Sequence, residues 1–446
     1  MKTPICDFVR RYAQSNALRL HMPGHKGKAL LGPEPMDLTE IEGADDLYHA
    51  AGIIRESEEN ASKLFGCETL YAVEGASQCI RAMLYLVVLH ARVQGKVARV
   101  AAGRNAHKTF VSAAALLNFE VLWLWGEGSY LSCGLTAQDL EAVLEREKPT
   151  AVYLTTPDYL GNVPDLAPLA EACHRHGVLL LVDNAHGAYL RFLPESRHPV
   201  DLGADLCCDS AHKTLPVLTG GAYLHLSPQA PALFSTQAKN ALALFGSTSP
   251  SYLILQSLDA ANRYLAQGYR EKLASFLSRM QALKDRLTAH GYSLQGEEPL
   301  KLTILAREYG YTGKGLAACL REKGLVCEFA DPDFTVMMLT PELDCADLQR
   351  LEDVLVSLPK RPPLCEKPPA FRLPTRVLSI REAMFSRMEE VPVEKSQGRI
   401  LAAATIGCPP AVPIVVCGER IDQWAVRCFR YYGMKTCTVV KEGLSY

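Results

Sequence analysis

The run Val178-Leu179-Leu180-Leu181-Val182 decides the fold, and the polar turn Asp183-Asn184-Ala185-His186-Gly187 follows it directly. Five consecutive apolar residues predict a strand that is buried on both faces, because a strand with one solvated face alternates between apolar and polar side chains. Strands of this kind are typical of parallel sheets that helices cover on both sides. The run therefore predicts a central strand of an α/β sheet, with Asp183 at its carboxyl end.

Predicted strands and helices alternate on either side of this run. Ser57 is the predicted cap of a helix that ends at Gly66, and Thr136 is the predicted cap of a later helix. The predicted strands span residues 69–73, 97–102, 120–125 and 151–155, and the predicted helices span 57–66, 76–95, 136–147 and 166–176. This alternation implies a largely parallel sheet between helices, and in such sheets ligands bind at the carboxyl ends of the strands.

The 446 residues are enough for several domains, and the pattern changes along the chain. We predict an N-terminal arm over residues 1–56, a large α/β domain over 57–270, a smaller α/β domain over 271–360, and a proline-rich linker with a C-terminal domain over 361–446. Later predicted helices span 264–289, 315–323 and 345–357, later predicted strands span 301–305, 326–329 and 335–339, and apolar runs at 412–416 and 436–440 indicate a structured tail.

Composition argues against several classes of protein. The formal net charge of −2 gives no electrostatic reason to expect a nucleic-acid partner. No apolar run reaches the roughly 18 residues that a membrane span needs, and the start Met1–Asp7 lacks the apolar segment of a secretory signal. The 15 cysteines are scattered without a C-x-x-C pair, which predicts reduced thiols in a cytoplasm and neither disulfides nor a metal site.

Side chains that can bind an anion or react follow several of the predicted strands. Gly75-Ala76-Ser77 joins a strand to a helix, where free N–H groups and the helix dipole favour a phosphate. His107 and Asp183 follow other strands, and Lys213 lies in the turn Ser210-Ala211-His212-Lys213-Thr214. Each alone has an ordinary explanation, such as a surface lysine or a tight turn. The patterns G-x-G-x-x-G and G-x-x-x-x-G-K-[ST] do not occur, which leaves a dinucleotide or Walker-type site without support.

Together these residues suit pyridoxal 5'-phosphate (PLP). This cofactor needs a lysine amine for its aldehyde, a carboxylate against its pyridine nitrogen, an anion site for its phosphate and a flat side chain over its ring. Lys213 offers the amine and Asp183 offers the carboxylate. Gly75-Ala76-Ser77 offers the anion site, and His107 is the candidate that stacks on the ring.

The sequence resembles the PLP-dependent Orn/Lys/Arg decarboxylase family of the fold-type-I aminotransferase superfamily, in its short form without an N-terminal wing domain. The resemblance spans nearly the whole chain and is specific as a combination of motifs. The matching stretches are His21-Met22-Pro23-Gly24-His25-Lys26-Gly27, Arg104-Asn105-Ala106-His107-Lys108-Thr109, Thr155-Thr156-Pro157, Asp183-Asn184-Ala185-His186-Gly187-Ala188, Ser210-Ala211-His212-Lys213-Thr214-Leu215, Thr248-Ser249-Pro250-Ser251-Tyr252, and Gly398-Arg399-Ile400 with Pro409-Pro410.

The resemblance implies a fold and a set of roles. The fold is a mostly parallel, seven-stranded-type sheet between helices, with smaller C-terminal α/β domains. Lys213 would be the Schiff-base lysine, Asp183 would pair with the pyridine nitrogen and His107 would stack on the ring. The remaining implied positions are His186 near the imine side of the ring, and for the phosphate the Gly75-Ala76-Ser77 turn, Ser210, His212 and a partner's Thr248 or Ser249.

The implied activity is the decarboxylation of arginine, lysine or ornithine to the corresponding amine, as in polyamine biosynthesis. His212 or Lys213 would return a proton to Cα. The resemblance also implies a cytoplasmic homodimer with shared active sites, whose ligand is a small amino acid and not a nucleic acid or a membrane.

Several positions depart from the family pattern. The usual Asp-Glu-Ala-His-Gly reads Asp183-Asn184-Ala185-His186-Gly187, a usual Thr is Asp158, and the usual Gly-Ser-Thr has Ala76 in its centre. In the C-terminal part, a usual Glu is missing at 402–404 and the usual Tyr-Pro-Pro-Gly reads Cys408-Pro409-Pro410-Ala411. These departures keep two alternatives open: an aminotransferase or lyase that acts on another amino acid, and a non-catalytic paralogue.

Overall fold

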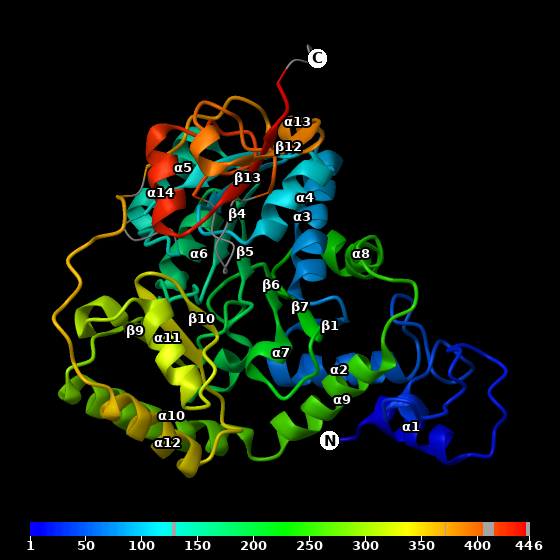
Figure 1. Cartoon of the computed structure of the whole chain (residues 1–446). Helices are drawn as coiled ribbons and strands as arrows, with labels where there is room; N and C mark the ends of the chain where they lie inside the picture. Colours follow the sequence, from blue (N-terminus) through cyan, green and yellow to red (C-terminus); the bar gives the residue numbers. More distant parts are fainter. Residues whose placement is uncertain (127–130, 371, 405–413, 443–446) are drawn as a thin grey trace. The chain divides into compact units, whose positions relative to one another are not determined.

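A computed structural model describes residues 1–126, 131–370, 372–404 and 414–442 of the chain (Figure 1). The chain divides into two compact units. The first unit comprises residues 1–98, 141–156 and 165–274, and the second comprises 99–140, 157–164 and 275–446. The domain boundaries predicted from the sequence remain predictions.

The predicted α/β sheet is present and has seven strands in the order β1-β7-β6-β5-β4-β2-β3. The pairs β4–β5, β5–β6 and β2–β3 are parallel, whereas β7 is antiparallel to both β1 and β6. The prediction of a mostly parallel sheet is therefore confirmed. The strands are β1 Glu68–Ala72, β2 Arg99–Gly103, β3 Glu120–Leu124, β4 Ala151–Thr155, β5 Leu179–Asp183, β6 Leu206–Asp209 and β7 Ala222–Leu226.

The first unit is organised around β5, in which every residue is buried. Helix α3 (Ala76–Val93) packs against β5, β6 and β7, which explains why the run at 178–182 lacks polar side chains. Helices α2 (Ile53–Phe65) and α9 (Tyr252–Ala266) lie side by side (Figure 1). The other helices of this unit are α1 Pro4–Gln14, α6 Leu166–Arg175, the one-turn α7 Ala211–Thr214 and α8 Ala232–Ala243. Helix α5 (Ala137–Glu147) has residues in both units.

Two helix predictions are wrong in instructive ways. Ser57 is not a cap: α2 begins four residues earlier, and the fully buried Ser57 hydroxyl lies 2.7 Å from the Tyr71 hydroxyl and 2.6 Å from Asp259 Oδ1. The predicted helix over 264–289 is two helices, because Gly268 adopts a φ of +76° that an α-helix cannot continue through. Helix α9 ends before this glycine, and α10 (Tyr269–His290) begins directly after it.

The second unit contains a four-stranded sheet of order β10-β11-β9-β8 and a two-stranded sheet of β12 and β13. The sheet strands are β8 Leu294–Gln295, β9 Lys301–Leu305, β10 Phe329–Ala330, β11 Phe334–Met338, β12 Met388–Pro392 and β13 Thr436–Val440. The helices are α4 Lys108–Leu117, α11 Gly313–Glu322, α12 Cys345–Ser357, α13 Ile380–Met384 and α14 Gln423–Tyr431, with a short 3-10 helix η3 at Ala306–Tyr309. The strand predicted at 326–329 is thus shorter and begins later than expected.

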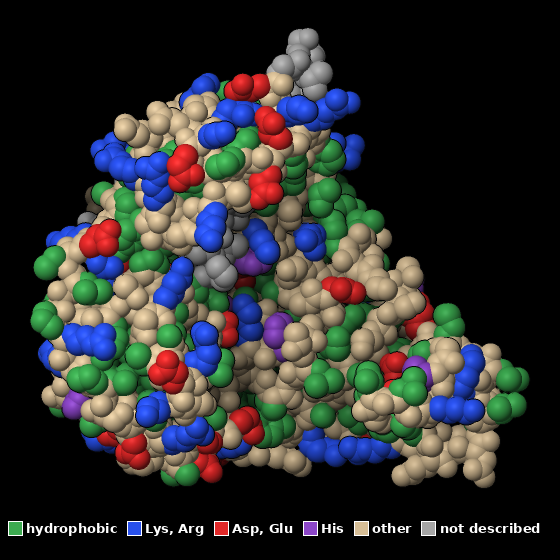
Figure 2. Space-filling view, viewed as in Figure 1, with side chains coloured by type: hydrophobic (Ala, Val, Ile, Leu, Met, Phe, Trp, Pro, Cys, Tyr) green, Lys and Arg blue, Asp and Glu red, His purple; other side chains and the backbone are tan. Residues whose placement is uncertain are grey.

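On the face shown in Figure 2, basic and acidic side chains are interspersed, in keeping with the formal net charge of −2. Among the described helices, none combines the length and the apolar character that a membrane span requires. The apolar run predicted at 412–416 lies partly outside the described residues, and the run at 436–440 forms β13.

Candidate active site

Lys213 and His186 meet at the carboxyl ends of two neighbouring parallel strands. Lys213 lies on α7, directly after β6, and His186 lies in the turn after β5. Because β5 and β6 pair in parallel, with Asp183 opposite Cys208, the turns that follow them lie at the same edge of the sheet. The Lys213 Nζ atom is 3.0 Å from His186 Nε2, and His186 is 5% exposed. The structure therefore brings a primary amine and an imidazole together at this edge.

Asp183 ends β5 as a buried carboxylate that already has three donors. Its Oδ2 accepts a hydrogen bond from the Tyr153 hydroxyl at 3.0 Å, and its Oδ1 accepts one from the Ala185 N–H at 3.2 Å and a weak one from Cys208 Sγ at 3.8 Å. Burial, followed by the charge of Asp183, raises the pKa of Tyr153 well above its ordinary value, so the phenol stays a donor. Sequence reasoning missed Tyr153, because nothing local marks a strand tyrosine as a partner of a distant aspartate.

The predicted anion site is an open turn at the start of α3. Gly75 precedes the helix with a φ of +70°, and a Cβ added to it would meet no atom within 4 Å. The Gly75 N–H is used by the carbonyl of Gly220 at 2.8 Å, which fixes the turn, while the first turn of α3 begins at Ala76 and Ser77. An open cradle beside first-turn N–H groups fits a phosphate.

Ser210 and His212 flank the lysine on α7. The carbonyl of Ser210 accepts a hydrogen bond from the Lys213 N–H at 3.0 Å, and His212 Nδ1 donates to the carbonyl of Gly221 at 3.0 Å. Burial lowers the pKa of His212 below its ordinary value, so the ring is neutral near pH 7 and carries its proton on Nδ1. Its Nε2 can then accept a hydrogen bond, and it can donate one to a phosphate only after protonation.

The remaining predicted site residues lie elsewhere. Thr248 and Ser249 are exposed in the bend before α9 of the first unit. His107 belongs to the second unit, where it caps α4: its Nδ1 accepts from the Thr109 N–H at 3.2 Å and lies 2.9 Å from Thr109 Oγ1. These contacts fix the orientation of the His107 side chain within its unit, and its stacking role stays a prediction.

A buried network explains one departure from the family pattern. The Asn184 side-chain amide donates to Asp209 Oδ1 at 2.7 Å, and the Asp209 Oδ2 atom lies 3.2 Å from His198 Nε2 and 3.1 Å from His225 Nε2. Burial alone would raise the pKa of Asp209, but the two imidazoles hold it below its ordinary value. An amide at position 184 thus avoids a second buried carboxylate beside Asp209. In the sequence, the one sign of this network was Asp209, a charged residue at the end of an apolar strand.

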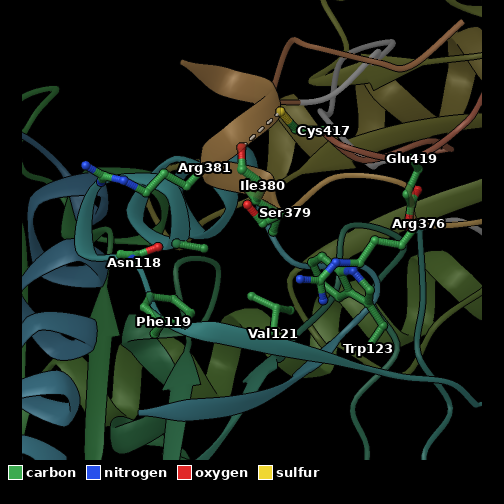
Figure 3. Close-up of a pocket in the computed structure, with 11 residues that line it drawn as sticks. Asn118, Phe119, Val121, Trp123, Arg376, Ser379, Ile380, Arg381, Cys417 and Glu419 are labelled. Carbon is green, nitrogen blue, oxygen red and sulfur yellow. Dashed lines mark hydrogen bonds between the residues drawn. The ribbon is translucent and has the colours of Figure 1, made fainter. Parts of the chain in front are cut away.

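Within the second unit, a buried ion pair joins Arg104, which precedes His107 in the chain, to Glu419 in the C-terminal part of the sequence. Arg104 Nη1 and Nη2 donate to the two carboxylate oxygens of Glu419 at 2.7 and 2.6 Å, and the Arg104 guanidinium lies 4.9 Å from the ring centre of Trp123. Glu419 and Trp123 also line a cavity of about 30 Å³, together with Arg376 (Figure 3). Such a cavity has room for little more than a water molecule. We therefore interpret this region as a packing contact between the Arg104 segment and the Glu419 segment, and not as a ligand site.

Two comparisons with family models decide the affiliation of the chain. Residues 3–297 match the model of the Orn/Lys/Arg decarboxylase major domain, and residues 372–439 match the model of the Orn/Lys/Arg decarboxylase C-terminal domain. The chain belongs to the Orn/Lys/Arg decarboxylase family. The enzymes of this family are PLP-dependent amino-acid decarboxylases, which confirms the predicted affiliation and class of enzyme.

Individual relatives agree with this family. The arginine decarboxylase of Halalkalibacterium halodurans is 29% identical, over 95% of this chain and 91% of that protein. The uncharacterized protein YaaO of Bacillus subtilis is 30% identical, over 98% of this chain and 95% of that protein. In structure, the lysine decarboxylase LdcF of Francisella novicida superposes with a TM-score of 0.80 at 17% identity, over 98% of this chain and 81% of that one. At this identity the superposition shows the shared fold.

The C-terminal stretch in which this chain departs from the family pattern lies only partly within the described residues. Ala402 is fully buried, and its N–H donates to the carbonyl of Thr438 at 3.0 Å. The departure at 408–411 lies outside the described residues. Asp158, another departure, closes a local turn by accepting from the N–H groups of Leu160 and Asn162, both at 2.9 Å.

Proposed function

We propose that this protein decarboxylates a basic amino acid (arginine, lysine or ornithine) with PLP bound at Lys213. The observation that carries the proposal is the meeting of Lys213 and His186 at 3.0 Å at the edge of the sheet where buried Asp183 ends β5. The names of the relatives that match 95% of the chain favour arginine as the substrate. Cytoplasmic residence is part of the same proposal.

The residues at this edge fit the cofactor group by group. The open cradle at Gly75 suits a phosphate, and the half-buried Ser77 lies in the first turn of α3 beside it. Asp183 would hold the pyridine N–H with a buried negative charge, and Lys213 would bind the aldehyde carbon. The chemistry that PLP supplies when bound is a place for the electron pair left behind by carbon dioxide.

The chain's own residues then have defined tasks. Asp183 would keep the ring nitrogen protonated, because a buried carboxylate favours a neighbouring positive charge. Tyr153 holds Asp183 in place through the 3.0 Å hydrogen bond. His186 orients the amine of Lys213, and either Lys213 or a protonated His212 would return a proton to Cα. Ser210, and His212 once it is protonated, would complete the phosphate contacts.

A substrate panel tests this function. The PLP-loaded protein is incubated with arginine, lysine and ornithine, and both carbon dioxide and amine are measured. We expect release from one of the three, with Lys213→Ala inactive and without the visible absorbance that PLP gains on binding to a lysine. Formation of a keto acid would indicate transamination instead. A wild-type protein that stays colourless with excess PLP would refute an enzymatic role at this site.

The proposal includes a homodimer with shared active sites. Thr248 and Ser249 are exposed, so they are available to a neighbouring subunit. In the N-terminal arm, four leucines are more than 80% exposed, and we assign them to the interface with the partner chain. They are Leu18 at 81%, Leu20 at 83%, Leu30 at 87% and Leu31 at 92%.

A further inference from the structure

The second unit contains a cavity of about 420 Å³ whose lining residues include none of those assigned to PLP. It is lined by residues of η3, the end of β9 and the start of β11, by Leu131, by Tyr432 directly after α14, and by linker residues between 364 and 370. Ligand-binding cavities commonly measure about 300–1,000 Å³, with apolar walls and a few placed polar groups. This cavity meets that description in size and composition.

The walls of the cavity are apolar and its charges are unequal. The apolar lining residues are Leu131, Leu305, Phe334, Leu364, Pro368, Pro369 and Ala370. The charged lining residues are three carboxylates, Glu308, Asp333 and Glu366, and two cations, Arg307 and Lys367. Arg307 lies 3.6 Å from Asp333 and 3.7 Å from Glu366, so Glu308 and Lys367 have no ion pair of their own among the described residues of the lining. An apolar chain that carries positive charge therefore suits the cavity better than an anion or a neutral polar molecule does.

Asp333 is the polar anchor of this cavity. Its side chain is 8% exposed, and its Oδ1 accepts from the Tyr431 hydroxyl and lies 3.6 Å from Arg307 Nε. Its Oδ2 is buried and has no hydrogen-bond partner among the described residues. A buried carboxylate oxygen without a donor is costly, so an N–H group of a ligand that reached it would relieve a penalty already present in the protein.

The linker that forms one wall is held in place. Its Leu364 N–H donates to the carbonyl of Arg307 at 3.0 Å, and its Arg361 N–H donates to the carbonyl of Tyr309 at 3.2 Å. The Arg361 guanidinium also stacks on Tyr311, 4.2 Å from the ring centre. The start of the linker, up to Leu364, is thus held against η3 by backbone hydrogen bonds.

We propose that this cavity binds an aliphatic amine, with its ammonium group on Asp333 and its methylene chain against Phe334 and Leu364. A decarboxylated basic amino acid belongs to this class, so the identification of the ligand as the reaction's own product rests on the function proposed above. The amino acid itself would bring a carboxylate toward Glu308 and Glu366, which disfavours it. The cavity is therefore a second site, selective for an aliphatic amine, and 1,5-diaminopentane is a simple member of that class.

Binding of 1,5-diaminopentane to the PLP-loaded protein tests the proposal. Equilibrium dialysis counts the amines bound per chain, and the visible absorbance of PLP reports binding near the cofactor. We expect a set of sites that binds the amine without changing the visible absorbance of PLP. Asp333→Asn keeps the shape and removes the charge, and it should weaken binding at these sites at least about tenfold, as loss of a hydrogen bond to a charged group does.

Two further variants keep the test decisive. Leu364 is 38% exposed, so Leu364→Lys adds a cation to the wall without opening the core, and it should abolish binding at the same sites. Asp353→Asn removes an exposed carboxylate of α12 that does not line the cavity, and it should bind as the wild type does.

Matched probes define the chemistry of the site. 6-Aminohexanoate, in which a carboxylate replaces one amine, should bind more weakly than 1,5-diaminopentane, and hexanoate should not bind. Unchanged binding in both Asp333→Asn and Leu364→Lys, or binding only with a change in the absorbance, would overturn the proposal. These readouts need no turnover, so a failure of the proposed decarboxylation would show separately, in the substrate panel.

Discussion

Asp183 is the residue on which the proposed chemistry depends most directly. Asp183→Asn keeps the size of the side chain and removes its charge, so the protein should still bind PLP. Its kcat should fall by roughly 100-fold or more, the size of effect seen when a preorganised electrostatic group is removed. Steady-state rates on the active substrate measure this, with bound PLP quantified by absorbance. Tyr153→Phe, which removes the hydroxyl that donates to Asp183 at 3.0 Å, should cost much less. Near-normal kcat in Asp183→Asn would refute its role.

Ser77 tests the phosphate cradle independently of the ring. Ser77→Ala should weaken PLP binding about tenfold or more, because a hydrogen bond to a charged group is worth about 1.5–3 kcal/mol. Titration of the apoprotein with PLP, followed by fluorescence, measures the dissociation constant. Ser235→Ala, at an exposed serine of α8, is the control. Equal affinities in wild type and Ser77→Ala would remove Ser77 from the phosphate contacts.

Asn184 and Asp209 are predicted to depend on each other. Asn184→Glu would place a second carboxylate beside the fully buried Asp209, at a cost of about 3–5 kcal/mol in the free energy of unfolding, the range for an uncompensated buried charge. Adding Asp209→Gln should recover most of that loss, because one acid and one amide are then restored with their positions exchanged. Urea unfolding of the single and double variants measures the coupling. Additive losses would show that the two residues act separately.

The elements differ in how far the sequence alone predicts them. Strand β5 was predicted to within a residue, because an apolar run between glycine and a polar turn has one common explanation. Ser57 and Gly268 were misread: a serine before acidic residues resembles a cap, and one glycine inside a helical pattern resembles a tolerated defect. In both places tertiary contacts or a left-handed φ decided the outcome.

The candidate site shows the same limit. Asp183 carries its own signal, since it directly follows a strand that the sequence predicts, and Lys213 is marked by the polar turn in which it lies. The Lys213–His186 contact could be inferred only from strand adjacency and the family resemblance. Tyr153 could not be inferred, because it reaches Asp183 across two neighbouring strands with ordinary sequences.

The pair Arg104–Glu419 links elements 315 residues apart and was invisible in the sequence. Glu419→Gln should destabilise the second unit by about 3–5 kcal/mol, because it leaves the 4%-exposed Arg104 guanidinium without a countercharge. Chemical unfolding followed by tryptophan fluorescence suits this measurement, since Trp123 lies against Arg104. Glu352→Gln breaks the more exposed pair with Arg286 and should cost no more than about 1 kcal/mol. Similar losses in both variants would contradict the importance of burial.

Assembly of two chains is the remaining prediction. The double variant Leu30→Asp with Leu31→Asp charges the two most exposed leucines of the N-terminal arm, at 87% and 92% exposed, and should not disturb the core of a single chain. If the arm is part of the interface, the wild type should have about twice the 49.0 kDa mass of one chain and the variant should shift toward the monomer. Light scattering after size-exclusion chromatography measures both.

Activity should follow assembly if the sites are shared. The arm variant should lose turnover at dilutions where it is monomeric, because Thr248 and Ser249 would then no longer reach a neighbour's phosphate site. Val326→Asp, at a residue of the second unit that is 85% exposed, changes an equally exposed apolar side chain outside the arm and should remain a dimer. A fully active monomer would show that each chain completes its own site, and Thr248 and Ser249 would then lose their assigned role.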